Sequence, residues 1–452
     1  MKFPRRLSLV FAGTLVCSSM PAQADSSAGV QAVTVGSNGN EPIIAGAADG
    51  TLYIAALQYI YRSDDGGAHW RQLPGPDIAA TVLASDSSIA VDPEGRLYMS
   101  FDYPYAGTTA VCTSDDRGDS WSCDPAVVPG GTDRMWVTAP STKEAYCVTN
   151  EGLYQTAFLI SQDRGTTWAP TQFANGTLSP QTGPLLQKPG GGNIVQAVEY
   201  SDPNDTSSSL AVYVYQPGVP ATVLSEVRPA PLPYLNGLPS GGFTTDGLLY
   251  LVSEDANDDG GRQLAVTRSP DEGQAWVKLP PLPGSQSGTV TFAWLAAGKP
   301  GHVGVIYYYS PVSGDPTILD AGAPWSVMWA ETQDAASAEP HWTVTKLEDV
   351  AHVGVICAAL SCAGDARFAG DFINAVFDAQ DHAQLTWMNE SESQSTFVRY
   401  ASTPFKPAKP GSAAHAASLP ETTQQTSRYG GALGFMLLLP LLGAGLRRRC
   451  PP

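Results

Sequence analysis

The residues of this sequence best suited to chemistry are a few arginines and nearby carboxylates. A guanidinium binds a carboxylate through two parallel hydrogen bonds, and a carboxyl group can act as a general acid. The candidates for a site are Asp133, Arg134, Arg228, Arg262, Arg367 and Asp371. They can form a pocket for an anionic ligand, or they can pair with one another and hold the fold together. The elements that position them decide between these alternatives.

A repeat of the pattern Ser-x-Asp-x-Gly-x-x-Trp predicts those elements. It occurs four times, at Ser63, Asp65, Gly67 and Trp70; at Ser114, Asp116, Gly118 and Trp121; at Ser161, Asp163, Gly165 and Trp168; and at Ser269, Asp271, Gly273 and Trp276. The Asp side chain can accept backbone N–H groups of a turn, and Gly takes the positive φ that the turn requires. We therefore interpret the repeat as a structural turn between two antiparallel strands, not as a catalytic motif.

This pattern resembles the Asp-box, or BNR repeat, of sialidase-like proteins, and the resemblance extends over most of residues 32 to 403. It implies an all-β propeller of four-stranded blades. In that family each box joins the third and fourth strands of a blade, on the outer rim and far from the active site. One large domain, residues 25–403, is therefore expected.

The spacing of the boxes predicts the number of blades. Asp65 and Asp116 lie 51 residues apart, Asp116 and Asp163 lie 47 apart, and Asp163 and Asp271 lie 108 apart, which leaves room for one blade without a box. Two more sets of strands follow the fourth box. The units 40–80, 85–128, 134–172, 183–227, 240–280, 290–347 and 368–403 give seven blades. Six blades, the number in true sialidases, is the alternative.

Blade topology sorts the arginines between two faces. The 1–2 and 3–4 hairpins point one way, whereas the 2–3 loops and the blade connections surround the central funnel, where propeller ligands bind. Arg134, Arg228, Arg262 and Arg367 fall on this funnel face, and the arginines beside the boxes fall on the opposite face. We favour ring-closing ion pairs with neighbouring blades, over a ligand pocket, for Asp133, Arg134, Arg367 and Asp371.

The resemblance to sialidases implies three arginines for the substrate carboxylate, a Tyr nucleophile activated by Glu, and an Asp acid. The N-terminal Arg-Ile-Pro-type motif of that family is replaced here by Glu41-Pro42-Ile43-Ile44, and spacing assigns no Tyr–Glu pair. We therefore expect a glycan or protein ligand on the funnel face, bound without the usual sialidase reaction. An active exo-glycosidase of the sialidase type is one alternative, and a structural cell-surface protein is another.

Cysteine placement favours an oxidising compartment. Cys112 and Cys123 flank one hairpin, and Cys357 and Cys362 are close in sequence, so both pairs are candidate disulfides. No Cys or His cluster has metal-ligand spacing, and no phosphate loop or dinucleotide fingerprint occurs, so we expect no metal and no cofactor. Residues 255–260 copy the first half of a calcium loop, but Val266 stands where the closing Glu belongs.

Both ends of the chain indicate export. Residues 1–24 combine Lys2, Arg5 and Arg6 with an apolar run and the Ala22-Gln23-Ala24 cleavage pattern of a signal peptide. Residues 404–429 have the composition of a flexible linker. Residues 430–452 contain, in this order, Gly430-Gly431, an apolar run and three arginines. This arrangement resembles the GlyGly-CTERM sorting signal of Gram-negative bacteria.

This resemblance implies a rhomboid-type protease as a partner, and a protein at the cell surface or in the medium. A transient or permanent membrane anchor is the alternative. With 25 Lys and Arg against 43 Asp and Glu, the net charge is −18, which argues against nucleic acid as a partner. Contact with the membrane is expected only through the C-terminal segment.

Overall fold

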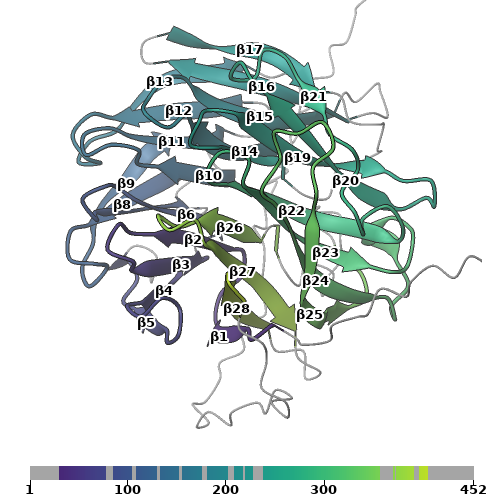
Figure 1. Cartoon of the computed structure of the whole chain (residues 1–452). Coiled ribbons are helices and arrows are strands. Elements are labelled where there is room, and N and C mark those ends of the chain that lie inside the picture. Colours follow the sequence, from purple (N-terminus) through teal and green to yellow (C-terminus); the bar gives the residue numbers. More distant parts are fainter. Residues whose placement is uncertain are drawn as a thin grey trace, which may run out of the picture.

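Short strands separated by tight turns build the whole architecture. The computed structural model describes residues 30–77, 85–103, 108–129, 133–151, 155–175, 181–201, 208–216, 219–227, 238–356, 370–371, 373–390 and 396–405. In these residues, 28 strands form seven four-stranded antiparallel sheets. The first strands of neighbouring sheets contact one another, so the sheets are the blades of a ring (Figure 1). The predicted seven-bladed propeller is confirmed.

The blades follow one another along the chain. Blades 1 and 2 contain β2 (Pro42–Gly46), β3 (Leu52–Ala56), β4 (Tyr59–Ser63), β5 (Arg71–Leu73), β6 (Ser85–Val91), β7 (Leu97–Tyr103), β8 (Thr108–Ser114) and β9 (Ser122–Pro129). Blades 3 and 4 contain β10 (Asp133–Thr138), β11 (Ala145–Glu151), β12 (Gln155–Ser161), β13 (Ala169–Asn175), β14 (Gln181–Gln187), β15 (Ile194–Ser201), β16 (Ser208–Gln216) and β17 (Val219–Val227). Blades 5 and 6 contain β18 (Ser240–Phe243), β19 (Leu249–Ala256), β20 (Arg262–Ser269), β21 (Val277–Lys278), β22 (Thr289–Ala297), β23 (Val303–Ser310), β24 (Pro324–Thr332) and β25 (Thr343–Val353), with the short 3-10 helix η1 (Pro316–Ile318).

The seventh blade is completed by the N-terminal end of the described chain. Its inner strands are β26 (Asn374–Phe377), β27 (Ala383–Glu390) and β28 (Thr396–Ser402), and its outermost strand is β1 (Val33–Gly36). Val33 is paired with Tyr400, and Thr34 with Arg399. Figure 1 shows β1 beside β28, where the two ends of the chain close the ring. This closure was not predicted, because four residues without a neighbouring partner give no hairpin signal.

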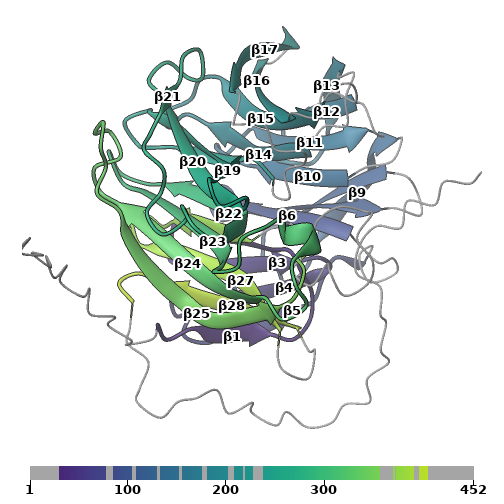
Figure 2. The ribbon, with the colours of Figure 1, turned by 90° about the vertical axis from the view of Figure 1, so that its right-hand side faces the viewer.

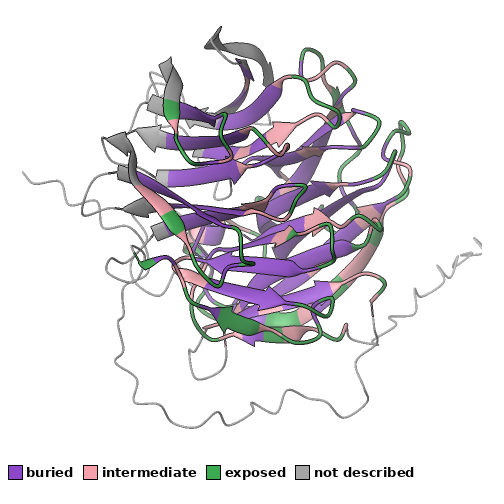
Figure 3. Ribbon diagram, turned by 90° about the vertical axis from the view of Figure 1, so that its left-hand side faces the viewer, coloured by how far each residue is buried: buried purple, intermediate pink, exposed green. Residues whose placement is uncertain are grey.

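The core lies between the blades rather than in one central mass. All five residues of β3 are buried, as are eight of the nine residues of β22. Both faces of such a strand are covered by neighbouring blades, so burial is continuous along the strand instead of alternating. Figure 3 shows the middle strands buried and the connecting turns exposed.

Each of the four Asp-boxes forms the turn between the third and fourth strands of its blade. In the first box the Ser63 hydroxyl donates to Asp65 (2.9 Å) and accepts from Gly67 N–H (2.9 Å), and Asp65 accepts from His69 N–H (2.9 Å). The same three bonds recur in the other three boxes. The hydrogen bonds from the His69 side chain, His69 N–H and Ser63 lower the pKa of Asp65 to about 2. These aspartates accept turn hydrogen bonds and lie far from the inner strands.

The boxes also join neighbouring blades. Gly67 has a positive φ of 86°, and a Cβ atom there would lie 2.0 Å from the ring of Tyr400 in blade 7. Trp70 meets the same Tyr400 edge-on, with 5.1 Å between the ring centroids. An arginine inside the third box, Arg164, pairs with Asp92 of blade 2 at 2.7 Å. Arg164 thus binds the preceding blade, on the face opposite the funnel.

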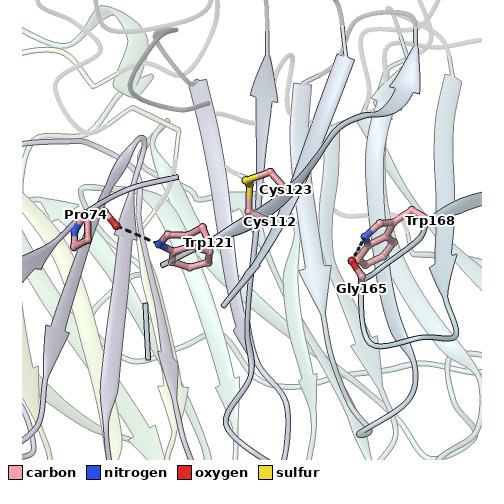
Figure 4. Close-up of a disulfide and its surroundings, with 6 residues drawn as sticks. All are labelled: Pro74, Cys112, Trp121, Cys123, Gly165 and Trp168. Carbon is pink, nitrogen blue, oxygen red and sulfur yellow. Dashed lines mark hydrogen bonds between the residues drawn. A yellow bond between two sulfur atoms is a disulfide. The ribbon is translucent and has the colours of Figure 1, made fainter. Parts of the chain in front are cut away.

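One disulfide links the outer strands of blade 2. Cys112 of β8 lies directly opposite Cys123 of β9, and the two sulfur atoms are bonded (Figure 4). The candidate pair Cys357 and Cys362 lies outside the described residues. Cys147 is a buried thiol on β11, and burial raises its pKa to about 12.

The predicted signal peptide, linker and C-terminal sorting segment lie outside the described residues, except for residues 404 and 405 of the linker. In the part of the chain that the structure describes, no helix is long and apolar enough to cross a membrane.

Candidate binding site at the funnel face

Two tryptophans fill the axis of the ring. Trp136 lies on β10 of blade 3 and Trp294 on β22 of blade 6, three blades away, yet their ring centroids are 5.4 Å apart. The Trp136 indole N–H also donates to the carbonyl of Thr182 in blade 4 (2.8 Å). Both indoles are buried. A ligand on the axis would therefore meet this pair as a floor.

Four charged residues gather where the inner strands begin, on the funnel side of that floor. Glu41 precedes β2, Asp86 lies in β6, Arg134 in β10, and Asp371 precedes β26. Arg134 Nη1 lies 2.9 Å from Asp371 Oδ2, and Asp86 Oδ2 accepts from Arg134 N–H at 3.0 Å. One carboxylate oxygen from each of Glu41, Asp86 and Asp371 lies within 4.8 Å of the others. We call these four residues the acid–arginine cluster.

The backbone turns these side chains inward. Glu41, Asp86 and Arg134 have positive φ values of 53°, 31° and 58°, which non-glycine residues rarely adopt. The pairing of the first two strands shifts register between Ser85 and Ser87 and between Asp133 and Trp136. Such bulges re-aim side chains at the start of a strand. Polar residues from four blades thus meet in the acid–arginine cluster.

Gly370 is required for this arrangement. It has a φ of 70°, and a Cβ atom there would lie 2.2 Å from Cγ of Glu41. Any side chain at position 370 would displace Glu41 from the acid–arginine cluster. The close approach fixes the connection before blade 7 against the connection before blade 1.

The charge of the cluster is unfavourable for an anion. Three carboxylates surround one guanidinium, and all four residues are buried. When all are ionised, the cluster carries a net charge of −2. Arg134 is therefore engaged by carboxylates of the protein itself and is not available to bind a ligand carboxylate.

Arg262 is engaged in the same way between blades 5 and 6. Its Nη1 lies 2.6 Å from Glu254 Oε2, and its Nη2 lies 3.2 Å from Asp315 Oδ1. The other oxygen of Glu254 accepts from Phe292 N–H (3.2 Å), at the start of the inner strand of blade 6. Arg262 is buried, so this network ties two blades together.

The remaining candidates are only partly placed. Arg228 and Arg367 lie outside the described residues, and Asp133 is described only as the first residue of β10. Asp371 pairs with Arg134 of blade 3. The sequence predicted ring-closing links to other blades for both residues, without naming their partners.

Sequence reasoning missed Glu41 and Asp86 as members of the cluster. A signal for Glu41 was present, because it opens the segment that replaces the Arg-Ile-Pro-type motif expected from the resemblance to sialidases. No such signal exists for Asp86, which lies among serines at the start of β6.

The calcium-like segment forms a polar turn. The Asn257 side-chain oxygen accepts from the N–H groups of Asp259 (3.1 Å) and Gly261 (2.8 Å). Asp255 lies on β19 and pairs with Lys278 at 2.6 Å. Asn257 and Asp255 thus direct these acceptors at groups of the protein itself.

No protein-family model matches this chain, and no curated protein matches it. Solved structures match most of it. A PL25 ulvan lyase has a TM-score of 0.51 at 11% identity, over 81% of this chain and 95% of the lyase. YCF48 from Cyanidioschyzon merolae has a TM-score of 0.45 at 14% identity, over 83% of this chain and 98% of that one. The phage phi92 endosialidase has a TM-score of 0.46 at 11% identity, over 89% and 71% respectively.

At these identities the likeness to the lyase shows a shared fold and says nothing about activity. The chain is a seven-bladed β-propeller of four-stranded blades.

Proposed function

We propose that this chain is an exported binding propeller whose funnel face holds an uncharged or cationic glycan or protein ligand without sialidase-type hydrolysis. The observation that carries the proposal is the burial of Arg134 and Arg262 in ion pairs with the protein's own carboxylates. A sialidase needs arginines that are open to the substrate.

Energetics support the same view. Removing one partner from a buried ion pair typically costs about 3–5 kcal/mol, because the other charge is left without compensation. A ligand carboxylate would have to displace Asp371 from Arg134 while approaching Glu41 and Asp86. The net charge of −18 adds a long-range repulsion. A neutral or positively charged ligand meets neither obstacle.

Export is part of the proposal. The disulfide between Cys112 and Cys123 fits an oxidising compartment, as does the signal-like N-terminus. We propose that a protease then removes the C-terminal segment and leaves the protein at the cell surface or in the medium.

One observation favours a second candidate, a glycoside hydrolase that uses carboxylates of the cluster. Oxygens of Glu41, Asp86 and Asp371 lie within 4.8 Å of one another, and retaining glycosidases place their two carboxyl groups about 5–5.5 Å apart. The burial of all three residues opposes this alternative, because the scissile bond must reach both groups.

An assay and a binding measurement separate the two candidates. The full chain is incubated with fluorogenic sialosides and with uncharged aryl glycosides, and is tested on an array of neutral, amino-sugar, sialylated and uronate glycans. The array includes -[GlcA(1-4)Rha3S]-, the saccharide bound to the ulvan lyase. We expect no release of fluorophore and binding confined to glycans without negative charge.

Turnover of any glycoside that Asp371→Asn abolishes at an unchanged melting temperature would replace the binding proposal with the hydrolase. Tight binding of a sialylated or uronate glycan would contradict the charge argument.

A further inference from the structure

Exposed apolar side chains concentrate at one corner of blade 6. In the described residues five large apolar side chains are exposed, and four belong to this corner: Val312 (37%), Ile318 (79%), Val350 (49%) and Val353 (50%). Val312 and Ile318 lie in the loop between β23 and β24, and the other two lie on the outermost strand, β25. The fifth, Val277 (47%), is on β21 of blade 5. We call the four residues the blade-6 corner.

The loop that presents Ile318 is held firmly. Asp315 caps η1 by accepting from Thr317 N–H (3.0 Å) and also pairs with the buried Arg262. Ile318 ends this capped turn, the short green coil in Figure 2. An apolar side chain fixed in an exposed position loses little conformational entropy when it is covered.

The end of β25 is tied to the same loop. Ile356 N–H donates to the carbonyl of Pro316 (3.1 Å), and Gly354 N–H donates to that of Ala323 (2.8 Å). The Trp325 indole N–H donates to the carbonyl of Gly354 (2.7 Å). Val353 therefore keeps a fixed position beside the loop that carries Ile318. Single exposed apolar residues are common, but a gathering of them on a rigid frame is typical of an interaction surface.

The charges around the corner favour a basic partner. Asp320 is exposed, and the side chain of Asp349 is 88% exposed. Lys346 lies 3.2 Å from Asp349 and offsets its charge, so Asp320 leaves these three residues with one negative charge in excess. A second copy of this chain would bring the same acidic groups and a net charge of −18 against them. A glycan is a poor occupant, because sugars stack on aromatic rings and the corner is aliphatic.

We propose that the blade-6 corner is a docking surface for a protein segment that presents apolar side chains next to Lys or Arg. Val350 and Val353 lie on β25, the outermost strand of the blade, whereas the acid–arginine cluster lies at the innermost strands. Val312 and Ile318 lie in a 2–3 loop, on the funnel side of blade 6.

The probe is a phage-displayed library of random linear peptides, selected on the immobilised full chain. Enriched peptides are synthesised and titrated against wild type, Ile318→Asp, Val353→Asp and the matched control Val277→Asp. We expect peptides rich in apolar and basic residues, an affinity at least about tenfold weaker for the two corner variants, and no change for the control. Binding should weaken as salt is raised.

Two further measurements keep the result specific. The melting temperatures of the corner variants should equal that of wild type, since these side chains are exposed. Asp371→Asn, which alters the funnel, should leave peptide binding unchanged, so the two sites fail independently. A library without enrichment, peptides that bind Ile318→Asp as well as wild type, or a dimer in sedimentation that Ile318→Asp dissociates would overturn the proposal.

Discussion

Arg134 Nη1 lies 2.9 Å from Asp371 Oδ2, and the two side chains are only 7% and 3% exposed. The two residues are far apart in sequence, one at the start of the inner strand of blade 3 and the other just before the inner strand of blade 7. Blades 1 and 2 lie between these two blades in the ring, and they contribute Glu41 and Asp86 to the same cluster. The ion pair therefore joins blades that do not follow one another around the ring.

Replacing Arg134 with Ala should lower the stability of the propeller. The change leaves three buried carboxylates without their cation, and we expect the free energy of unfolding to fall by about 3–5 kcal/mol. Thermal unfolding followed by circular dichroism measures this loss. Arg71→Ala is the control, because Arg71 is half-exposed and its pair with Asp119 is worth little. A normal melting temperature for Arg134→Ala, together with lost ligand binding, would instead make Arg134 a ligand residue.

The Asp-box aspartates should act on stability and not on binding. Asp163 accepts from Thr167 N–H (2.9 Å) and from the Ser161 hydroxyl (2.9 Å). Asp163→Ala should cost about 1 kcal/mol, since water can partly replace the lost acceptor in an exposed turn. Asp258→Ala, in a turn without a box, is the control and should unfold like wild type. Loss of ligand binding by folded Asp163→Ala would show that the box has a functional role.

The fold was predictable because the Asp-box is a local signal. Ser, Asp and Gly of each box bond to one another within a few residues, so four boxes mark four blades directly. The acid–arginine cluster depends instead on Glu41 and Asp371 meeting from opposite ends of the sequence, and on positive φ at non-glycine residues. The pairing of β1 with β28 is equally non-local. The spacing of residues within a single sequence therefore predicts neither the cluster nor this strand pairing.

The disulfide should stabilise the outer edge of blade 2. It closes a loop of 11 residues, for which loss of unfolded-state entropy predicts about 2–3 kcal/mol. The double variant Cys112→Ala/Cys123→Ala should melt earlier than wild type, and reductant should lower the melting temperature of wild type but not of the double variant. Cys147→Ser changes a buried thiol outside the bridge, so reductant should still lower its melting temperature. Insensitivity of wild type to reductant would show that the bridge is not formed in solution.

The C-terminal segment should be absent from the exported protein. Gly430-Gly431, the following apolar run and Arg447 to Arg449 have the order expected of a sorting signal. Intact-mass analysis of protein from the native host should give a chain that ends before residue 432. Changing Gly430 and Gly431 to Leu should leave the segment attached and hold the protein in the membrane fraction. Exported protein that still carries Cys450 would reduce the segment to a plain anchor.

His302 should make the stability of the contact between blades 6 and 7 depend on pH. It lies in the turn after β22, with Nδ1 2.7 Å from Asp381 of blade 7 and Nε2 2.6 Å from Glu331 of β24. A neutral imidazole has one N–H, so only the imidazolium can donate to both carboxylates. Burial lowers the pKa of His302, but the hydrogen bonds to Glu331 and Asp381 outweigh it and raise the pKa above 6.5.

The sign of the pH effect follows from that shift. A group with a raised pKa in the folded state contributes its full stability below the unfolded value near 6.5, and this contribution is lost as the pH rises through the folded value. The melting temperature of wild type should therefore fall as the pH is raised above 6.5, and His302→Gln should lack this part of the fall. His341→Gln is the matched control. The pKa of His341 is also raised, by the Asp334 carboxylate, but the ring is exposed and its pair is screened by water. If the melting temperatures of wild type and His302→Gln depended on pH in the same way, His302 would not join blades 6 and 7 as an imidazolium.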